Sequence, residues 1–504
     1  MGSKLSPWRA VDTASHERQV FERTIFGFES VLASFNEHAF GPAEPSVGLQ
    51  IGVNTSMQGQ GLERKISNAW LDVFAELPDL ACTLVRHDDK DSIRLQFTPL
   101  SDRARKDWLE QTLEVERENQ SIEDLRIQLS TVLPLGRVNE PDSYMIKLVV
   151  SMSTRADLLS ILIRSHHVLF DGPGLLSVLD RFLERLALDG HGTLDNDHVA
   201  PGVDMQSPLR RLRSHALDAV GMTEDDYNSG EPYGDLGKRL IESKAGLPLN
   251  ESFACKMKPW PRDALPTKLH RFRLDKETSK DFLRACKERG LTAAYGIGAC
   301  LILATLELFR TEEEITMGYD DAVIVVTFNL RRWMAEKEGL KGTASSAETG
   351  LLIAATGLFD CMIAEGRMEV EHCLWFIAEQ LKEFFTDRLK QISSFAGKGA
   401  HGFWHAYNQE AAAMASGQSE TTFKTGIGLN SVGIVEAYLK RSYGTGHGGQ
   451  DGDHTFAVQD CQIDMRCGGS VSQPHIWTFR NQTELNMGYV EAMFTPQGPE
   501  LLAR

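Results

Sequence analysis

The sequence predicts an α/β protein built from two domains. With 504 residues the chain exceeds what one hydrophobic core usually organises. Segments with strand-like and helix-like spacing of apolar residues alternate in both halves of the chain. A stretch rich in glycine and proline separates the halves at residues 191–266. We therefore expect an N-terminal domain at 1–190, a crossover or linker at 191–266 and a C-terminal domain at 267–504.

Composition excludes several classes of protein. The chain is 42% hydrophobic and 24% charged, with a formal net charge of -17, so it repels the phosphate backbone of nucleic acids. Its eight cysteines form no Cys-x-x-Cys pair, and no targeting segment is evident, which favours reduced thiols and the cytoplasm. Polar residues interrupt the most apolar run, residues 291–309, which therefore predicts a buried helix and no membrane span.

In the first half, the spacing of apolar residues predicts a strand at 47–53, a helix at 62–77, a hairpin of 81–85 with 93–97, and a charged surface helix at 106–117. Two strongly apolar segments, 145–152 and 158–166, are separated by a short polar turn. We expect them to pair as antiparallel strands. An apolar stripe over 175–188 then predicts a helix.

Two adjacent histidines stand where the second of these strands ends. His166 and His167 are followed by Asp171, Gly172 and Pro173, and proline fits the first turn of a helix. The pattern therefore lies on a strand-to-helix loop, where catalytic residues are often held. Histidine is the side chain best suited to transfer protons near neutral pH. A simpler interpretation is also open, in which Asp171 caps the helix and His167 is a buried histidine at a strand end.

The second half repeats the general plan without a detectable sequence repeat. Its spacing predicts helices at 276–289, 291–309 and 370–388, helical parts of 395–415, and strands at 269–274, 322–328, 350–359, 425–435, 454–463, 475–479 and 485–490, the last four forming a late sheet. A glycine-rich segment at 441–454 lacks the Lys-Ser/Thr pair of a phosphate-binding loop, which excludes that kind of nucleotide site. His401 and His405 have helical metal-ligand spacing, but Gly402 weakens a helix there and we expect no metal.

The pattern His-His-x-x-x-Asp-Gly resembles the active-site motif of a large acyltransferase superfamily. Its members include chloramphenicol acetyltransferase, the plant BAHD enzymes, fungal trichothecene and alcohol acetyltransferases, and the condensation domains of peptide synthetases. The resemblance implies two chloramphenicol-acetyltransferase-like (CAT-like) α/β-sandwich domains with mixed sheets and an interdomain tunnel. The Asp-Phe-Gly-Trp-Gly motif of the plant enzymes is absent, which favours the fungal or condensation-like branches.

The resemblance also assigns roles to the motif. It implies that His167 is the general base, that His166 is the less critical first histidine, and that Gly172 gives the backbone room. It implies that Asp171 points away from the reaction and forms a structural ion pair. Arg331 ends a predicted strand of the second domain and is the candidate partner of Asp171, with Arg332 in reserve.

Three further residues are candidates for contacts with the oxyanion or the substrate. Asn430 and Ser431 lie in a segment similar to the Ser-Asn-x-Gly strand of the alcohol acetyltransferases, with the two residues interchanged. Thr327 lies on the strand that precedes Arg331. For Asn430 and Ser431, a place in the strand ladder or in a turn is the favoured interpretation over a role as oxyanion donors.

The resemblance implies an acyltransferase that moves an acyl group, expected to be acetyl, from acyl-CoA to a hydroxyl of a small specialised metabolite. Acyl-CoA would be a co-substrate, and no cofactor would be permanently bound. We expect a cytoplasmic monomer with no nucleic-acid or membrane partner. Three alternatives remain: a condensation-like enzyme that uses a carrier-protein thioester, a non-acylating cyclase or isomerase, and a binding protein with an inactive site.

Overall fold

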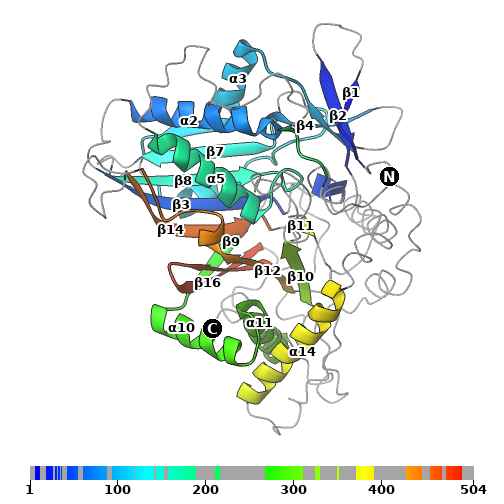
Figure 1. Cartoon of the computed structure of the whole chain (residues 1–504), viewed down its shortest axis with the longest axis vertical. Coiled ribbons are helices and arrows are strands. Elements are labelled where there is room, and N and C mark those ends of the chain that lie inside the picture. The colour runs from blue at the N-terminus through cyan, green and yellow to red at the C-terminus, as the bar shows by residue number, and fades with distance from the viewer. Residues whose placement is uncertain are drawn as a thin grey trace.

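Three β-sheets with helices packed against them form the described part of the molecule (Figure 1). The computed structural model describes residues 6–11, 19–25, 29–30, 32–33, 36, 43–54, 61–87, 93–118, 120–140, 143–152, 157–188, 211–215, 267–309, 324–329, 349–350, 370–390, 427–444, 455–467 and 473–490. In this part of the chain, no helix is both long enough and apolar enough to cross a membrane. The architecture is a mixed α/β fold, as the sequence predicts.

The first six-stranded sheet has the strand order β13-β14-β3-β8-β7-β6. These strands are β13 (Ser442–Tyr443), β14 (Phe456–Met465), β3 (Pro45–Val53), β8 (Leu158–Ser165), β7 (Ile146–Met152) and β6 (Leu113–Glu116). Strands β7 and β8 pair antiparallel, with Ile146 opposite Ser165, which confirms the predicted pairing. Strand β14 pairs with β3, although the sequence pattern assigned its residues to the late sheet of the second half. The C-terminal half thus supplies a strand to the N-terminal sheet.

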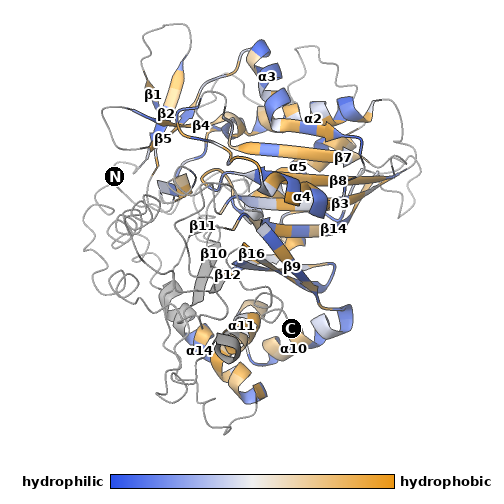
Figure 2. Ribbon diagram, turned by 180° about the vertical axis from the view of Figure 1, so that it is seen from behind, coloured by the Kyte–Doolittle hydropathy of each residue, from blue (hydrophilic) through white to orange (hydrophobic). Residues whose placement is uncertain are grey.

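Helices cover both faces of this sheet. Helices α2 (Leu62–Glu76) and α5 (Gly172–Ala187) lie on one face, and α4 (Ile122–Ser130) lies on the other, as Figure 2 shows from behind. Successive side chains of β8 point to opposite faces of the sheet, and both sets are apolar and buried. Ile161 and Ile163 join the main core, while Leu162 joins a small cluster under α4. Strand β8 is therefore buried on both sides, and the loop that follows it is fixed by the core.

The expected surface helix at 106–117 ends earlier than its charge pattern suggests. Helix α3 (Asp102–Thr112) begins at the N-cap Ser101, and the next four residues form strand β6. These residues, Leu-Glu-Val-Glu, alternate with a period of two and pair in parallel with β7. A separate sheet of four short antiparallel strands contains β1 (Arg9–Val11), β2 (Val20–Thr24), β5 (Ile93–Phe97) and β4 (Thr83–Arg86), the last following the 3-10 turn η2 (Pro78–Ala81).

The second six-stranded sheet belongs to the C-terminal half. Its order is β11 (Thr349–Gly350), β10 (Ile324–Asn329), β12 (Ile427–Ile434), β15 (Gln473–Phe479), β16 (Gln482–Val490) and β9 (Thr267–Arg273), with the short turn η5 (Val435–Ala437) after β12. Strands β10, β12 and β15 are parallel, and the other pairs are antiparallel. Helices α10 (Lys276–Glu288) and α11 (Ala293–Phe309) pack on it, and α14 (Val370–Lys390) packs against α11. Of the expected strand at 350–359, only Gly350 lies within the described residues.

The two large sheets meet along β14, at the centre of Figure 1. Arg271 of β9 reaches across to Asp460 of β14, with both nitrogen–oxygen distances at 2.7 Å. The Asn486 side chain of β16 donates a hydrogen bond to the carbonyl oxygen of Ile463 at 3.0 Å. Strands β9 and β16 of the second sheet therefore contact β14 of the first.

Candidate active site

The loop that carries both histidines is held rigidly by its backbone. We call residues 166–171 the histidine loop. The backbone N–H of His166 donates to the carbonyl of Met145 at 2.8 Å, and Ser165 Oγ donates to the same carbonyl at 3.0 Å. The N–H of Leu169 in turn donates to the carbonyl of His166 at 2.9 Å. These bonds tie the backbone of the loop to the start of β7.

His166 is buried inside the loop. Its side chain is 1% exposed, and its Nδ1 accepts the backbone N–H of Val168 at 3.0 Å. Burial lowers the pKa of His166 to about 3, so this imidazole is neutral at physiological pH. A buried histidine that holds the turn fits the proposal that the first histidine of the motif has a supporting role.

His167 is partly buried and differs from its neighbour. Burial lowers its pKa below the ordinary value for histidine, while the charge of Asp171 and a hydrogen bond to the residue's own backbone act in the opposite direction. The imidazole is therefore neutral near pH 7. A neutral ring has one N–H and one unprotonated nitrogen, which is the form that a general base requires.

Asp171 is the N-cap of helix α5. Its side chain is 5% exposed, and Oδ1 accepts the backbone N–H of Gly174 at 2.7 Å. The carboxylate also lies at the positive end of the helix dipole, which stabilises its charge. The capping role considered from the sequence is thus present. Arg331 and Arg332, the candidate ion-pair partners, lie outside the described residues.

Gly172 marks the contact between the histidine loop and the strands of the C-terminal half. A Cβ atom placed on Gly172 would lie 3.6 Å from Ile463 Cγ2 on β14 and 3.8 Å from Val432 Cγ2 on β12. These are ordinary van der Waals distances. The protein itself therefore leaves room for a side chain here, and any requirement for glycine would come from a bound substrate.

The candidate contact residues of the C-terminal half lie on adjacent strands. Thr327 and Asn430 are partners in the parallel register of β10 and β12. The side chain of Asn430 donates to Gln473 Oε1 at 3.4 Å. Ser431 follows Asn430 in the same strand, so its side chain projects from the opposite face of the sheet. The side chains of Asn430 and Ser431 therefore cannot both line the same face of the sheet.

His475 is a residue of this site that the sequence analysis did not single out. It lies beside Asn430 in the register of β12 and β15, and its side chain is 7% exposed. Burial lowers the pKa of His475 to about 4, and a positive charge on His167 would lower it further. The pKa of His475 thus depends on the charge of His167, a residue from the other half of the chain. In the sequence, His475 was visible as the first residue of a predicted strand.

No protein-family model and no curated protein matches the chain. Several solved structures match the chain. The TRI3 trichothecene 15-O-acetyltransferase from Fusarium sporotrichioides matches with a TM-score of 0.78 and 16% identity, over 100% of this chain and 96% of that one. The polyketide synthase associated protein 5 from Mycobacterium tuberculosis has a TM-score of 0.56 at 14% identity, over 95% of this chain and 96% of that one. The condensation domain of the Monacolin K polyketide synthase MokA has a TM-score of 0.54 at 11% identity, over 95% of this chain and 94% of that one.

The chain shares the fold of these proteins, which is the CAT-like α/β fold expected from the histidine motif. The match to the trichothecene acetyltransferase spans the whole chain, so both halves share this fold. The recognition of the fold from the histidine motif is confirmed.

A segment of the expected linker, residues 211–215, supports the histidine loop. Arg213 donates from Nη1 to the carbonyl of Leu169 at 3.2 Å, and its guanidinium lies 4.4 Å from the centre of the Phe170 ring. Its Nε lies 3.3 Å from Oδ2 of Asp79, a carboxylate that is 2% exposed. No local sequence signal marks Arg213, because its partners are distant in the chain.

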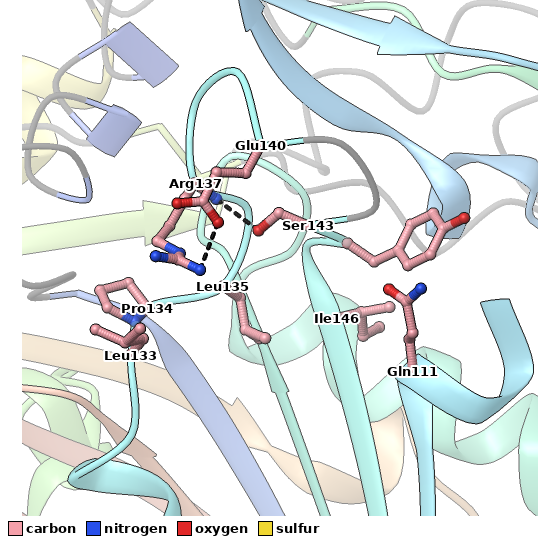
Figure 3. A pocket seen from close by; sticks show the side chains of 9 residues that line it. Gln111, Leu133, Pro134, Leu135, Arg137, Glu140, Ser143 and Ile146 are labelled. Carbon is pink, nitrogen blue, oxygen red and sulfur yellow. Dashed lines mark hydrogen bonds and ion pairs between the residues drawn. The ribbon is translucent and has the colours of Figure 1, made fainter. Parts of the chain in front are cut away.

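A surface pocket of about 430 Å³ lies beside the start of β7 (Figure 3). Its lining residues are Gln111, Leu133, Pro134, Leu135, Arg137, Glu140, Ser143, Tyr144 and Ile146. Arg137 forms an ion pair with Glu140, and its backbone N–H donates to Ser143 Oγ at 2.9 Å. Gly136, within this segment, is packed against the histidine loop, since a Cβ there would lie 3.4 Å from His166 Cδ2.

Metal-ligand side chains do not gather in the described part of the chain: no group of three His, Cys, Asp or Glu residues there could hold an ion. His401 and His405 lie outside the described residues.

Proposed function

We propose that the chain is an acyl-CoA-dependent O-acyltransferase whose acceptor is a hydroxylated small molecule. The observation that carries the proposal is the neutral imidazole of His167 on a loop that ends at Gly172, beside strands of the C-terminal half. Support also comes from the greater similarity of the fold to an O-acetyltransferase, at a TM-score of 0.78, than to a condensation domain, at 0.54. A cytoplasmic location and a monomeric state remain part of this proposal.

In the proposed reaction, the unprotonated ring nitrogen of His167 removes the proton from the acceptor hydroxyl. The oxygen then attacks the thioester carbonyl and forms a tetrahedral intermediate. When the intermediate collapses, the carbon–sulfur bond breaks, and the leaving CoA thiolate takes the proton back from the imidazolium. The products are an ester and CoA thiol, and His167 returns to its neutral form. Proton transfer of this kind contributes about 10²–10⁴-fold to the rate.

Asp171 would hold the loop in this mechanism without accepting a proton. Its Oδ1 caps helix α5, so its charge is fixed near His167 and stabilises the imidazolium that forms during the reaction. Asn430 is the proposed donor to the oxyanion from the C-terminal half, together with the backbone N–H of Gly172.

The test measures release of CoA thiol from acetyl-CoA with a panel of small hydroxylated acceptors. We expect turnover by the wild-type chain and a loss of about 10²-fold or more in His167→Ala. His372→Ala, an exposed histidine on α14, is the matched control and should keep wild-type turnover. Full activity in His167→Ala would exclude the general-base role.

The same assay separates the alternatives. Turnover with an acyl group on a phosphopantetheine carrier protein, and none with acetyl-CoA, would favour a condensation-like enzyme. Rearrangement of a polyene or epoxide without any thiol release would favour a cyclase or isomerase built on the same fold.

A further inference from the structure

Three polar side chains form a row across the C-terminal sheet. In the register of the strands, Asn430 of β12 is the partner of His475 on β15, and His475 is the partner of Asn486 on β16. Side chains at partnered positions of neighbouring strands project from the same face of a sheet. Asn430, His475 and Asn486 therefore share one face.

This face is directed toward the histidine loop. Asn486 donates to the carbonyl of Ile463 on β14 at 3.0 Å, which shows that its face is turned to the N-terminal sheet. The Cγ2 atom of the same Ile463 would lie 3.6 Å from a Cβ on Gly172, at the end of the loop. The dependence of the His475 pKa on the charge of His167 agrees with this placement.

The hydrogen bond of His475 defines which of its nitrogens carries the proton. Nδ1 lies 3.1 Å from the carbonyl oxygen of Gln473, and a carbonyl oxygen can only accept a hydrogen bond. Nδ1 is therefore the protonated nitrogen, and Nε2 is an unprotonated acceptor. None of the described residues donates a hydrogen bond to Nε2. A ligand that supplies an N–H or O–H group would therefore form a hydrogen bond with Nε2.

We propose that His475 is a second substrate-binding histidine, whose Nε2 accepts a hydrogen bond from a neutral N–H or O–H group of a bound substrate. This inference rests on the proposed function, because that function defines the substrates. Both substrates of the proposed reaction carry such a donor group. Acyl-CoA has the amide N–H groups of its pantetheine arm, and a polyhydroxylated acceptor has a second hydroxyl. A carboxylate offers only acceptors to Nε2, so the site disfavours acidic acceptors.

The two histidines would then have separate tasks. His167 gains a proton during the reaction, and its positive charge opposes protonation of His475. His475 therefore stays neutral and binds the substrate, while His167 transfers the proton. His475 is a specificity-determining residue in this scheme and takes no part in the proton transfer.

The test compares His475→Gln and His475→Leu with the wild-type chain. Glutamine retains an acceptor oxygen at a similar reach, whereas leucine keeps the bulk and removes the acceptor. His270→Leu is the matched control, because His270 is the partner of Met487, one position from Asn486, and so lies on the opposite face of the same sheet. Thermal unfolding of each variant shows whether it is folded.

Two measurements distinguish the two sources of the donor group. Calorimetry gives the affinity for acetyl-CoA and requires no turnover. Steady-state kinetics with acetyl-CoA gives the ratio of kcat/KM for cis-1,2-cyclohexanediol to that for cyclohexanol. We expect His475→Leu to lower one of these two quantities by about tenfold, and His475→Gln to recover most of the loss. A loss of affinity assigns the pantetheine N–H, and a loss of diol preference assigns the acceptor hydroxyl.

The inference is overturned if His475→Leu keeps both quantities within about twofold of wild type, or if it loses no more than His270→Leu does. It is also overturned if the wild-type chain neither binds acetyl-CoA nor prefers the diol. Failure of the proposed function is a different result: the wild-type chain then releases no CoA thiol with any alcohol, while the comparison of acetyl-CoA affinities still decides the role of His475.

Discussion

The Oδ1 atom of Asp171 accepts the backbone N–H of Gly174 at 2.7 Å, which makes the motif aspartate the N-cap of helix α5. Replacement by alanine removes the cap and should lower the free energy of unfolding by about 1 kcal/mol, within a range of about 0.5–2 kcal/mol. Asparagine keeps an oxygen at the same position and should retain most of the stability. Urea unfolding of Asp171→Ala and Asp171→Asn measures the difference. Equal stability of alanine and wild type would contradict the capping role.

The pH dependence of the reaction should report on His167. The imidazole must be neutral to act as a base, and burial lowers its pKa below the ordinary value. The acid limb of kcat/KM should therefore lie below the ordinary pKa of histidine, about 6.5. Because the negative charge of Asp171 raises the pKa of His167, Asp171→Asn should move this limb to still lower pH. A shift to higher pH would contradict the assignment of His167 as the titrating base.

Local signals account for the parts of the fold that the sequence predicts well. Strands β7 and β8 are continuous apolar segments joined by a short turn, and α5 has both an apolar stripe and a proline in its first turn. Helix α4 also had a readable signal, since Ser121 and Asp124 form a capping box, but the apolar spacing there is weak.

The parts that were not predicted depend on contacts between distant residues. Alternation identifies β14 as a strand but does not reveal that its neighbour is β3, some four hundred positions earlier in the chain. The importance of His475 similarly follows from the register that places it beside Asn430. A single sequence gives the identity of such side chains, but their neighbours are set by the tertiary fold.

Two glycines near the histidines should respond differently to substitution by alanine. Gly136 has a positive φ of 63°, and a Cβ there would overlap Met145 Cγ, so a side chain strains both the backbone and the packing. Gly136→Ala should destabilise the fold by at least about 1 kcal/mol. Gly172→Ala meets only ordinary contacts and should leave the unfolding free energy within about 0.5 kcal/mol of wild type.

Comparison of activity with stability separates the roles of these glycines. If backbone room at Gly172 serves the substrate, Gly172→Ala should lower kcat/KM while the unfolding curve stays unchanged. Unchanged kinetics in a stable Gly172→Ala would remove Gly172 from the proposed site. Chemical denaturation and the thiol-release assay supply both measurements.

Arg213 should support the histidine loop through Asp79. Arg213→Ala removes the guanidinium that contacts the Leu169 carbonyl and the Phe170 ring, and it deprives the buried carboxylate of Asp79 of its ion pair with Arg213. Breaking a buried ion pair in this way costs about 3–5 kcal/mol. A looser histidine loop should also lower kcat by on the order of 10–100-fold.

A double-mutant cycle with Asp79→Asn tests the pair directly. Since the asparagine has no charge to be left behind, the combination of Arg213→Met with Asp79→Asn should be less destabilising than the sum of the two single substitutions. Arg211→Ala is the control within the same segment, because Arg211 donates to the carbonyl of Ala75, a residue of helix α2. Strictly additive effects on unfolding, with unchanged kcat in Arg213→Ala, would show that this segment merely covers the loop without positioning His167.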